Sequence, residues 1–131
     1  IQTYDPENDV IQKTINNDYE GYYKNESGMR KLLNYPPYGR IINIIISSEN
    51  EEGLKDKAEK LYNMIKERNS FIPKPFKAPI YRINNRYRYQ IFIKSDRMSI
   101  NGMKSKIKNS LINYKEKDVR ISVDVDPINL L

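Results

Sequence analysis

Apolar side chains recur at the period of a β-strand in four segments of the chain. Residues 41–46 form a nearly continuous β-branched run broken only by Asn43, which is typical of a central strand covered on both faces. Between two later segments, Asn84 and Asn85 suit the positive φ values of a tight hairpin turn. The pattern predicts strands at residues 41–46, 80–83, 87–94 and 119–125.

Apolar residues recur at the helical period between these strands. Residues 51–68 and residues 100–114 each carry a stripe of five apolar side chains with charged residues elsewhere, so both segments are expected to be amphipathic helices. Asn50 and Ser99 are the expected N-caps, because their short polar side chains can accept hydrogen bonds from free backbone N–H groups.

The N-terminal part is predicted to be helical and separate from the rest. Asp5-Pro6 is a typical helix start, and a second helix is expected over residues 19–33. Pro36-Pro37 ends that helix, because proline lacks the backbone N–H that a helix needs. We therefore divide the chain into residues 1–38, a connecting helical segment, and residues 39–131, the domain proper.

The element order from residue 41 onward is β-α-β-β-α-β, with a Pro-rich loop at residues 71–79 that Phe71 and Phe76 would anchor. This order predicts an α+β, ferredoxin-like fold in which two helices cover one face of a four-stranded antiparallel sheet. The other face needs water, a ligand or another element against it. The helix at residues 19–33 either covers part of that face or packs on a neighbour that the chain lacks.

Positive charge is concentrated in one part of the chain. Residues 74–120 contain thirteen Lys and Arg against three Asp and Glu, a net charge of +10, whereas the rest has ten basic and fourteen acidic residues, a net charge of −4. Such a region attracts polyanions through phosphate contacts and counterion release; the alternative is a strand with a charged, solvated face. The cations expected to contact such a polyanion are Arg86, Lys94, Lys104, Lys108 and Arg120.

Composition limits the possible chemistry. The chain has no Cys and no His, which removes thiol nucleophiles, disulfides, imidazole bases and conventional zinc sites. No glycine-rich phosphate loop is present, so the chain is not expected to hydrolyse ATP alone.

Asp124 and Asp126 share a strand face and could hold a hard metal ion or act as an acid/base pair; alternatively, they are strand-end charges that meet Arg or Lys. Tyr87 and Tyr89 could stack on bases or pack within the sheet.

Several segments, taken in order, resemble the C-terminal region of the PriA family of primosomal replication-restart helicases. They are IQTYDP at residues 1–6, the R-x4-Y-P-P stretch from Arg30 to Pro37, the R-x-R-x-Q-I strand from Arg86, and D-V-D-P at residues 124–127. Their consistent order and spacing make the set much more specific than any one motif, and the resemblance covers almost the whole chain. It implies that residues 1–38 are the tail of the second helicase lobe and its connecting helices.

The resemblance implies a C-terminal DNA- and partner-binding domain of an ATP-dependent 3′-to-5′ DNA helicase that acts in primosome assembly at stalled forks. Its expected partners are branched or single-stranded DNA, the acidic, Phe-ending tail of single-stranded DNA-binding protein, and the helicase core of the same chain. Arg97 and Asn101 match the family's Arg and amide at the tail site, with Asn in place of the family's Gln. Alternatively, Arg97 pairs with Asp96 or Glu116.

The same resemblance places ATP, Mg and Zn upstream, with no cofactor in this fragment, in a cytoplasmic protein without a membrane segment. The chain starts at Ile1 without Met, so we expect a fragment or a processed product. Two other functions stay open: a structural domain that docks on the helicase lobes and binds nothing by itself, and an RNA-binding ribosomal-type module. An independent small enzyme is the least favoured, because the chain lacks His, Cys and a phosphate loop.

Overall fold

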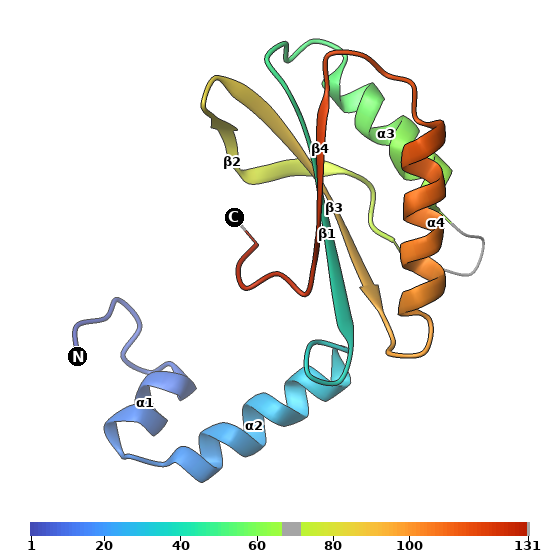
Figure 1. The fold of residues 1–131 in the computed structure, drawn as a ribbon. Helices are drawn as coiled ribbons and strands as arrows, with labels where there is room; N and C mark the ends of the chain where they lie inside the picture. Colours follow the sequence, from blue (N-terminus) through green and yellow to red (C-terminus); the bar gives the residue numbers. More distant parts are fainter. Residues whose placement is uncertain (67–71, 131) are drawn as a thin grey trace.

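A computed structural model describes residues 1–66 and 72–130 (Figure 1). In chain order the elements are α1 (Asp9–Ile15), α2 (Tyr19–Leu32), β1 (Arg40–Ser48), α3 (Leu54–Ile65), β2 (Phe76–Ile83), β3 (Arg86–Ser95), α4 (Ile100–Asn113) and β4 (Arg120–Val125). The strands form one sheet in the order β2-β3-β1-β4, and every neighbouring pair is antiparallel. Helices α3 and α4 cover one face (Figure 1). The predicted α+β, βαββαβ fold is confirmed.

The core lies between the sheet and the two covering helices. Ile42 and Ile44 of β1 are fully buried and face Ile93 and Ile91 of β3 across the ladder. Ile107 of α4 joins the same cluster. Burying such a side chain stabilises the fold by roughly 1.5–3 kcal/mol. The isoleucines that predicted these strands therefore also make a large contribution to the stability of the fold.

Asn43 interrupts the β-branched run because its side chain points to the opposite face of the sheet from Ile42 and Ile44. There its Oδ1 accepts a hydrogen bond from Gln90 Nε2 at 2.7 Å. Asn43 is 5% exposed and Gln90 is 2% exposed, while Gln90 Oε1 has no hydrogen-bond partner within the described ranges. The second face of the sheet therefore has a buried polar pair at its centre.

Two predicted helix starts are wrong. Asn8 rather than Asp5 caps α1, and its Oδ1 accepts from a backbone N–H at 3.0 Å. Helix α3 starts after Gly53, whose φ of 70° lies in the left-handed region that glycine adopts without steric cost. Asn50 acts earlier, where its Oδ1 accepts from Glu52 N at 3.0 Å. The cap of α1 thus lies three residues later than expected, and Asn50 stabilises the turn before α3 rather than its first turn.

The β2–β3 hairpin forms as predicted, but its first strand is longer than expected. Asn84 and Asn85 have φ values of 49° and 61°, which are the positive values that the turn requires. Strand β2 begins at Phe76, so Pro79 lies within it rather than in a loop. Proline is tolerated because β2 is an edge strand with an irregular register at this point. Phe71, the other expected anchor, lies outside the described residues.

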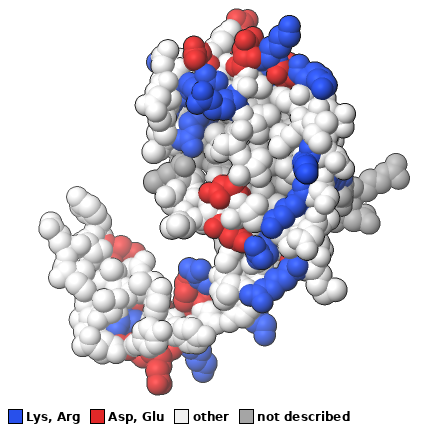
Figure 2. Space-filling model, in the orientation of Figure 1, with Lys and Arg blue, Asp and Glu red and all other residues white. Residues whose placement is uncertain are grey.

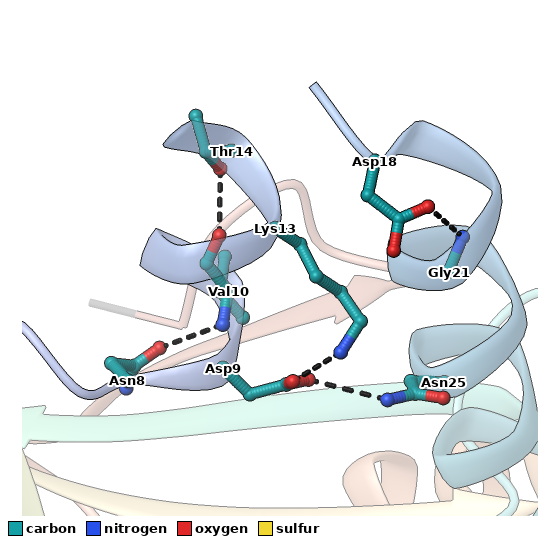
Figure 3. Close-up of polar contacts among 8 residues, drawn as sticks. All are labelled: Asn8, Asp9, Val10, Lys13, Thr14, Asp18, Gly21 and Asn25. Carbon is teal, nitrogen blue, oxygen red and sulfur yellow. Dashed lines mark hydrogen bonds and ion pairs between the residues drawn. The ribbon is translucent and has the colours of Figure 1, made fainter. Parts of the chain in front are cut away.

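Helices α1 and α2 form an arm that extends away from the sheet (Figure 1). Neither helix has a buried residue, which excludes the first of the two alternatives for the second helix, that it covers part of the open face. Within the arm, the Asp9 carboxylate pairs with Lys13 and accepts from Asn25 of α2 at 3.2 Å (Figure 3). The hydrogen bond from Lys13 is the main reason that the pKa of Asp9 lies below its ordinary value.

Helix α2 starts at a cap that depends on glycine. Asp18 Oδ1 accepts from Gly21 N at 2.9 Å (Figure 3), and a Cβ at Gly21 would lie only 2.1 Å from the other Asp18 carboxylate oxygen. Glycine therefore allows the carboxylate to sit directly on the first turn.

Candidate nucleic-acid and partner interface

The structure places the predicted DNA-contacting cations in three separate groups. Arg86 and Arg120 line a polar hollow of about 510 Å³ at the hairpin end of the sheet, together with Lys57. Arg86 is already engaged there: one NH group pairs with Glu49 at 2.9 Å, and the other donates to Ser47 O at 3.0 Å. Arg120 is exposed and forms no ion pair in the described part of the chain. Of these two side chains, Arg120 therefore has the more accessible guanidinium group.

Lys104 and Lys108 form the second group, on the side of α4 nearer to β4. Both are exposed, and neither forms an ion pair with a carboxylate within residues 1–66 and 72–130. Lys106 faces another way, because its Nζ donates to Lys66 O at 3.2 Å. Figure 2 shows Lys and Arg side chains on the side of the molecule that α4 occupies in Figure 1, with uncharged surface and acidic side chains beside them.

Lys94 and Arg97 form the third group, at the other end of β3, where both hold the connector between α2 and β1. Lys94 Nζ lies 4.7 Å from the centroid of the Tyr35 ring and donates to Leu33 O at 3.4 Å. Arg97 donates from one NH group to Pro37 O at 2.6 Å. These two cations therefore have a structural role that the sequence did not indicate.

Arg97 and Asn101 both lie at the N-terminal end of α4, where both are exposed. Arg97 pairs with neither of the expected acidic residues. The Asp96 carboxylate instead accepts from Ser99 N at 2.7 Å and from Ser99 Oγ at 2.9 Å, and Glu116 pairs with Lys60. Those Ser99 hydrogen bonds hold the pKa of Asp96 below its ordinary value. Ser99 occupies the N-cap position, as predicted, but its own side chain makes no capping hydrogen bond.

The two candidate base-stacking tyrosines pack toward the helices instead. Tyr89 is 7% exposed and belongs to a core cluster with Ile46. The Tyr81 ring lies 5.5 Å from the Tyr87 ring and 5.9 Å from the Tyr89 ring. Tyr87 and Tyr89 are thus packing residues, which was the alternative reading of their pattern.

Asp126 is a structural residue at the end of β4. Its carboxylate pairs with Arg40 and accepts from Ile41 N at 3.0 Å. The hydrogen bond from Arg40 is the main cause that lowers the pKa of Asp126. Asp124 is exposed on the same strand, and within the described ranges no group of three or more acidic residues could hold a metal ion. The ion-pair reading of Asp126 is confirmed.

An apolar groove between α4 and β4 was not predicted. It has a volume of about 450 Å³, and Lys104 and Lys108 stand on its rim. Two signals in the sequence could have indicated it: Ile112 lies outside the apolar stripe of α4, and this topology makes the last strand an edge. Lys57, in the polar hollow, had no sequence signal, because it comes from α3 and approaches the other cations only in the folded chain.

Comparison with known proteins identifies the family. The family model described as "Primosomal protein N C-terminal domain" matches residues 31–128. The chain belongs to this family. The family match covers all three groups of cations and the R-x-R-x-Q-I strand.

Curated relatives agree with the primosomal protein N C-terminal domain assignment. "Replication restart protein PriA" of Borreliella burgdorferi is 34% identical over all of this chain and 20% of its own length. The protein of the same name from Bacillus subtilis is 34% identical over all of this chain and 17% of its length. The one from Thermotoga maritima is 31% identical over 73% of this chain and 13% of its length. The chain thus spans a fifth or less of these relatives.

Nothing in the described helices suggests a membrane segment. Over residues 1–66 and 72–130, no helix is both long enough and apolar enough to cross a bilayer.

Proposed function

We propose that this chain is the DNA- and partner-binding C-terminal domain of an ATP-dependent 3′-to-5′ DNA helicase of replication restart. The observation that carries the DNA half is the set of exposed cations Lys104, Lys108 and Arg120, none of which forms a direct ion pair with a carboxylate within the described residues. Such cations release counterions from phosphates on binding, which gives affinity that does not depend on sequence and weakens with salt. Family membership supports the same proposal.

The DNA half is tested by fluorescence anisotropy of the 131-residue chain with labelled single-stranded and forked DNA at two salt concentrations. We expect binding that weakens by at least about tenfold between roughly 50 and 200 mM salt, as a few phosphate contacts require. Absence of salt-sensitive binding to both DNAs would remove this half of the proposal.

The partner half assigns Arg97 and Asn101 to the acidic, Phe-ending tail of single-stranded DNA-binding protein. A guanidinium carries five N–H donors, so Arg97 can hold Pro37 O with one NH group and still offer others to a carboxylate. The Asn101 amide lies in the first turn of the adjacent helix. The geometry is compatible with a shared role in the fold and in binding.

An acidic peptide ending in a free Phe carboxylate tests this assignment. Arg97→Ala and Asn101→Ala should each weaken binding of the peptide. Lys106→Ala should not, because Lys106 lies on the same helix but is directed toward Lys66. Equal affinity in all three variants would move the partner site elsewhere.

The arm favours a second role, docking onto the helicase core of the parent chain. Helix α2 exposes Tyr19, Tyr23, Met29 and Leu32 at 73%, 61%, 54% and 78%, an unusual amount of apolar surface for a helix with no buried residue. In this proposal the ATP, Mg and Zn sites belong to the upstream part of a cytoplasmic parent protein. A chain with Tyr23→Ser and Leu32→Ser should lose affinity for the separately produced upstream part, whereas Lys24→Ser should retain it.

A further inference from the structure

The α4–β4 groove combines an apolar floor with a charged rim. Val123 and Val125 of β4 form one wall, Ile107 and Leu111 of α4 form the other, and fully buried Ile42 lies beneath. Val123 remains 39% exposed and Ile112 remains 61% exposed. Apolar side chains of this size are normally covered when they line a continuous depression.

The strand that borders the groove has a free edge. Strand β4 pairs only with β1 in the sheet order. Asp126 N donates to Ile41 O at 2.7 Å, and because backbone groups alternate in direction along an antiparallel strand, those of Ile121, Val123 and Val125 point away from β1. An extended segment can therefore add to β4 through main-chain hydrogen bonds, and its alternate side chains would enter the groove.

The groove changes character along its length. Lys104 and Lys108 flank the half nearer the start of α4, and Leu111 and Ile112 flank the other half. Four helical residues rise by about 6 Å, which is close to the roughly 6.8 Å between alternate side chains of a strand. Two carboxylates at positions i and i+2 of an added strand therefore match the spacing of the two lysines.

We propose that the free edge of β4 and the adjoining groove bind an extended segment of a partner protein. On the face turned toward α4, this segment carries two acidic side chains followed by two apolar side chains. This inference goes beyond the proposed DNA and tail sites. Unlike a tail, the segment needs no terminal carboxylate, because the backbone of β4 and the two lysines supply its polar contacts.

Two other occupants fit less well. If a second copy of the chain paired along the same edge, both α4 helices would lie on one side of the joined sheet, and their Lys104 and Lys108 would face one another. Nucleic-acid bases prefer aromatic platforms, whereas the walls of the groove are aliphatic.

The probe is the capped peptide acetyl-Ser-Glu-Thr-Asp-Ser-Ile-Thr-Leu-Ser-amide together with its reversed sequence, since either strand direction is possible. One control peptide has Lys in place of both acidic residues, and the other has Ser in place of Ile and Leu. We expect the 131-residue chain to bind the probe in at least one direction and to bind both controls at least about fivefold more weakly, as the loss of two ion pairs or of the apolar anchors implies.

Variants of the chain locate the site. Val123→Asp should weaken the probe more than about tenfold, because it puts an unpaired charge in the groove, while Ser122→Asp, on the opposite face of the same strand, should change affinity by less than about twofold. The pair Lys104→Ala and Lys108→Ala should weaken the probe, whereas Arg97→Ala should not. Circular dichroism checks that each variant is folded.

Three results would overturn the proposal. The first is no binding of either probe direction at about 1 mM peptide. The second is a dimer of the chain that Val123→Asp converts to a monomer. The third is loss of DNA binding in Val123→Asp as large as in the double lysine variant, which would assign the groove to DNA. Loss of DNA binding in the lysine variant alone would support the proposed DNA site and leave the groove assignment intact.

Discussion

Asp126, considered from the sequence as a possible metal ligand or acid/base residue, instead stabilises the fold together with Arg40. The Asp126 carboxylate joins the end of β4 to the start of β1 through Arg40 and Ile41 N. Asp126→Asn should lower the free energy of unfolding by about 1 kcal/mol at neutral pH, since both partners are partly exposed and water screens the pair. Asp124→Asn, on the same exposed strand, should cost much less.

The same pair has a defined pH dependence. The pKa of Asp126 in the folded chain lies below its ordinary value of 3.8, so the unfolded chain takes up this proton first as the pH falls. The contribution of the Asp126 carboxylate to the free energy of unfolding is therefore complete above about pH 5. It is lost as the pH falls through the lowered pKa of Asp126 in the folded chain. Urea unfolding at several pH values should show wild type and Asp126→Asn converging in acid; a constant difference would contradict the assignment.

Asn43 and Gln90 illustrate why a buried polar pair behaves as a unit. Gln90→Leu alone leaves Asn43 Oδ1 buried without its donor and should cost about 1–3 kcal/mol. The double variant Asn43→Val with Gln90→Leu removes both polar groups and should be close to wild type in stability. Urea unfolding of wild type, Asn43→Val, Gln90→Leu and the double variant measures the coupling between the two side chains. Additive losses in the double variant would show that the pair is not coupled.

At the scale of elements, hydrogen bonds attach the connector between α2 and β1 to the end of β3. Arg97 holds Pro37 O, Lys94 holds Leu33 O, and Arg30 donates to Pro36 O at 3.1 Å. No residue of α1 or α2 is buried, so apolar packing contributes little to holding the arm against the domain. The orientation of the arm therefore depends on a small number of bonds between cations and carbonyl groups.

Removing one of these bonds should loosen the arm. The chain has no Cys, so spin labels can be attached at Tyr23→Cys in α2 and Lys55→Cys in α3 without further changes. Arg97→Ala should broaden the distribution of distances between the labels, while Arg120→Ala, which does not touch the connector, should leave it unchanged. An equally narrow distribution in Arg97→Ala would show that other contacts fix the arm.

The sequence predicted the order and approximate positions of the strands and helices well. It did not predict the local hydrogen bonds at the helix ends. The isoleucine run and the two amphipathic stripes specified the strands and covering helices because burial dominates their energetics. Helix starts involve at most a single side-chain capping hydrogen bond, so a neighbouring residue such as Asn8 can take the role expected of Asp5.

At the scale of the whole molecule, charge was predicted in amount but not in distribution. The excess between residues 74 and 120 is visible in the sequence, whereas its division among the hollow, α4 and the connector is not. Arg97, for example, is engaged by Pro37 O, a group sixty residues away in the chain. Contacts between residues so far apart in the sequence form only in the folded chain. The composition therefore could not show which cations are free to contact DNA.

The salt dependence of DNA binding tests the central claim most directly. The logarithm of the association constant for single-stranded DNA, plotted against the logarithm of salt concentration, changes slope by about 0.7 for each phosphate contact. Replacing Lys104, Lys108 and Arg120 by Ala should make the slope shallower by about 2. Replacing Lys24, Lys31 and Lys55 by Ala changes the net charge equally but should leave the slope almost unchanged. Equal effects of the two triple replacements would contradict a DNA surface on α4 and β4.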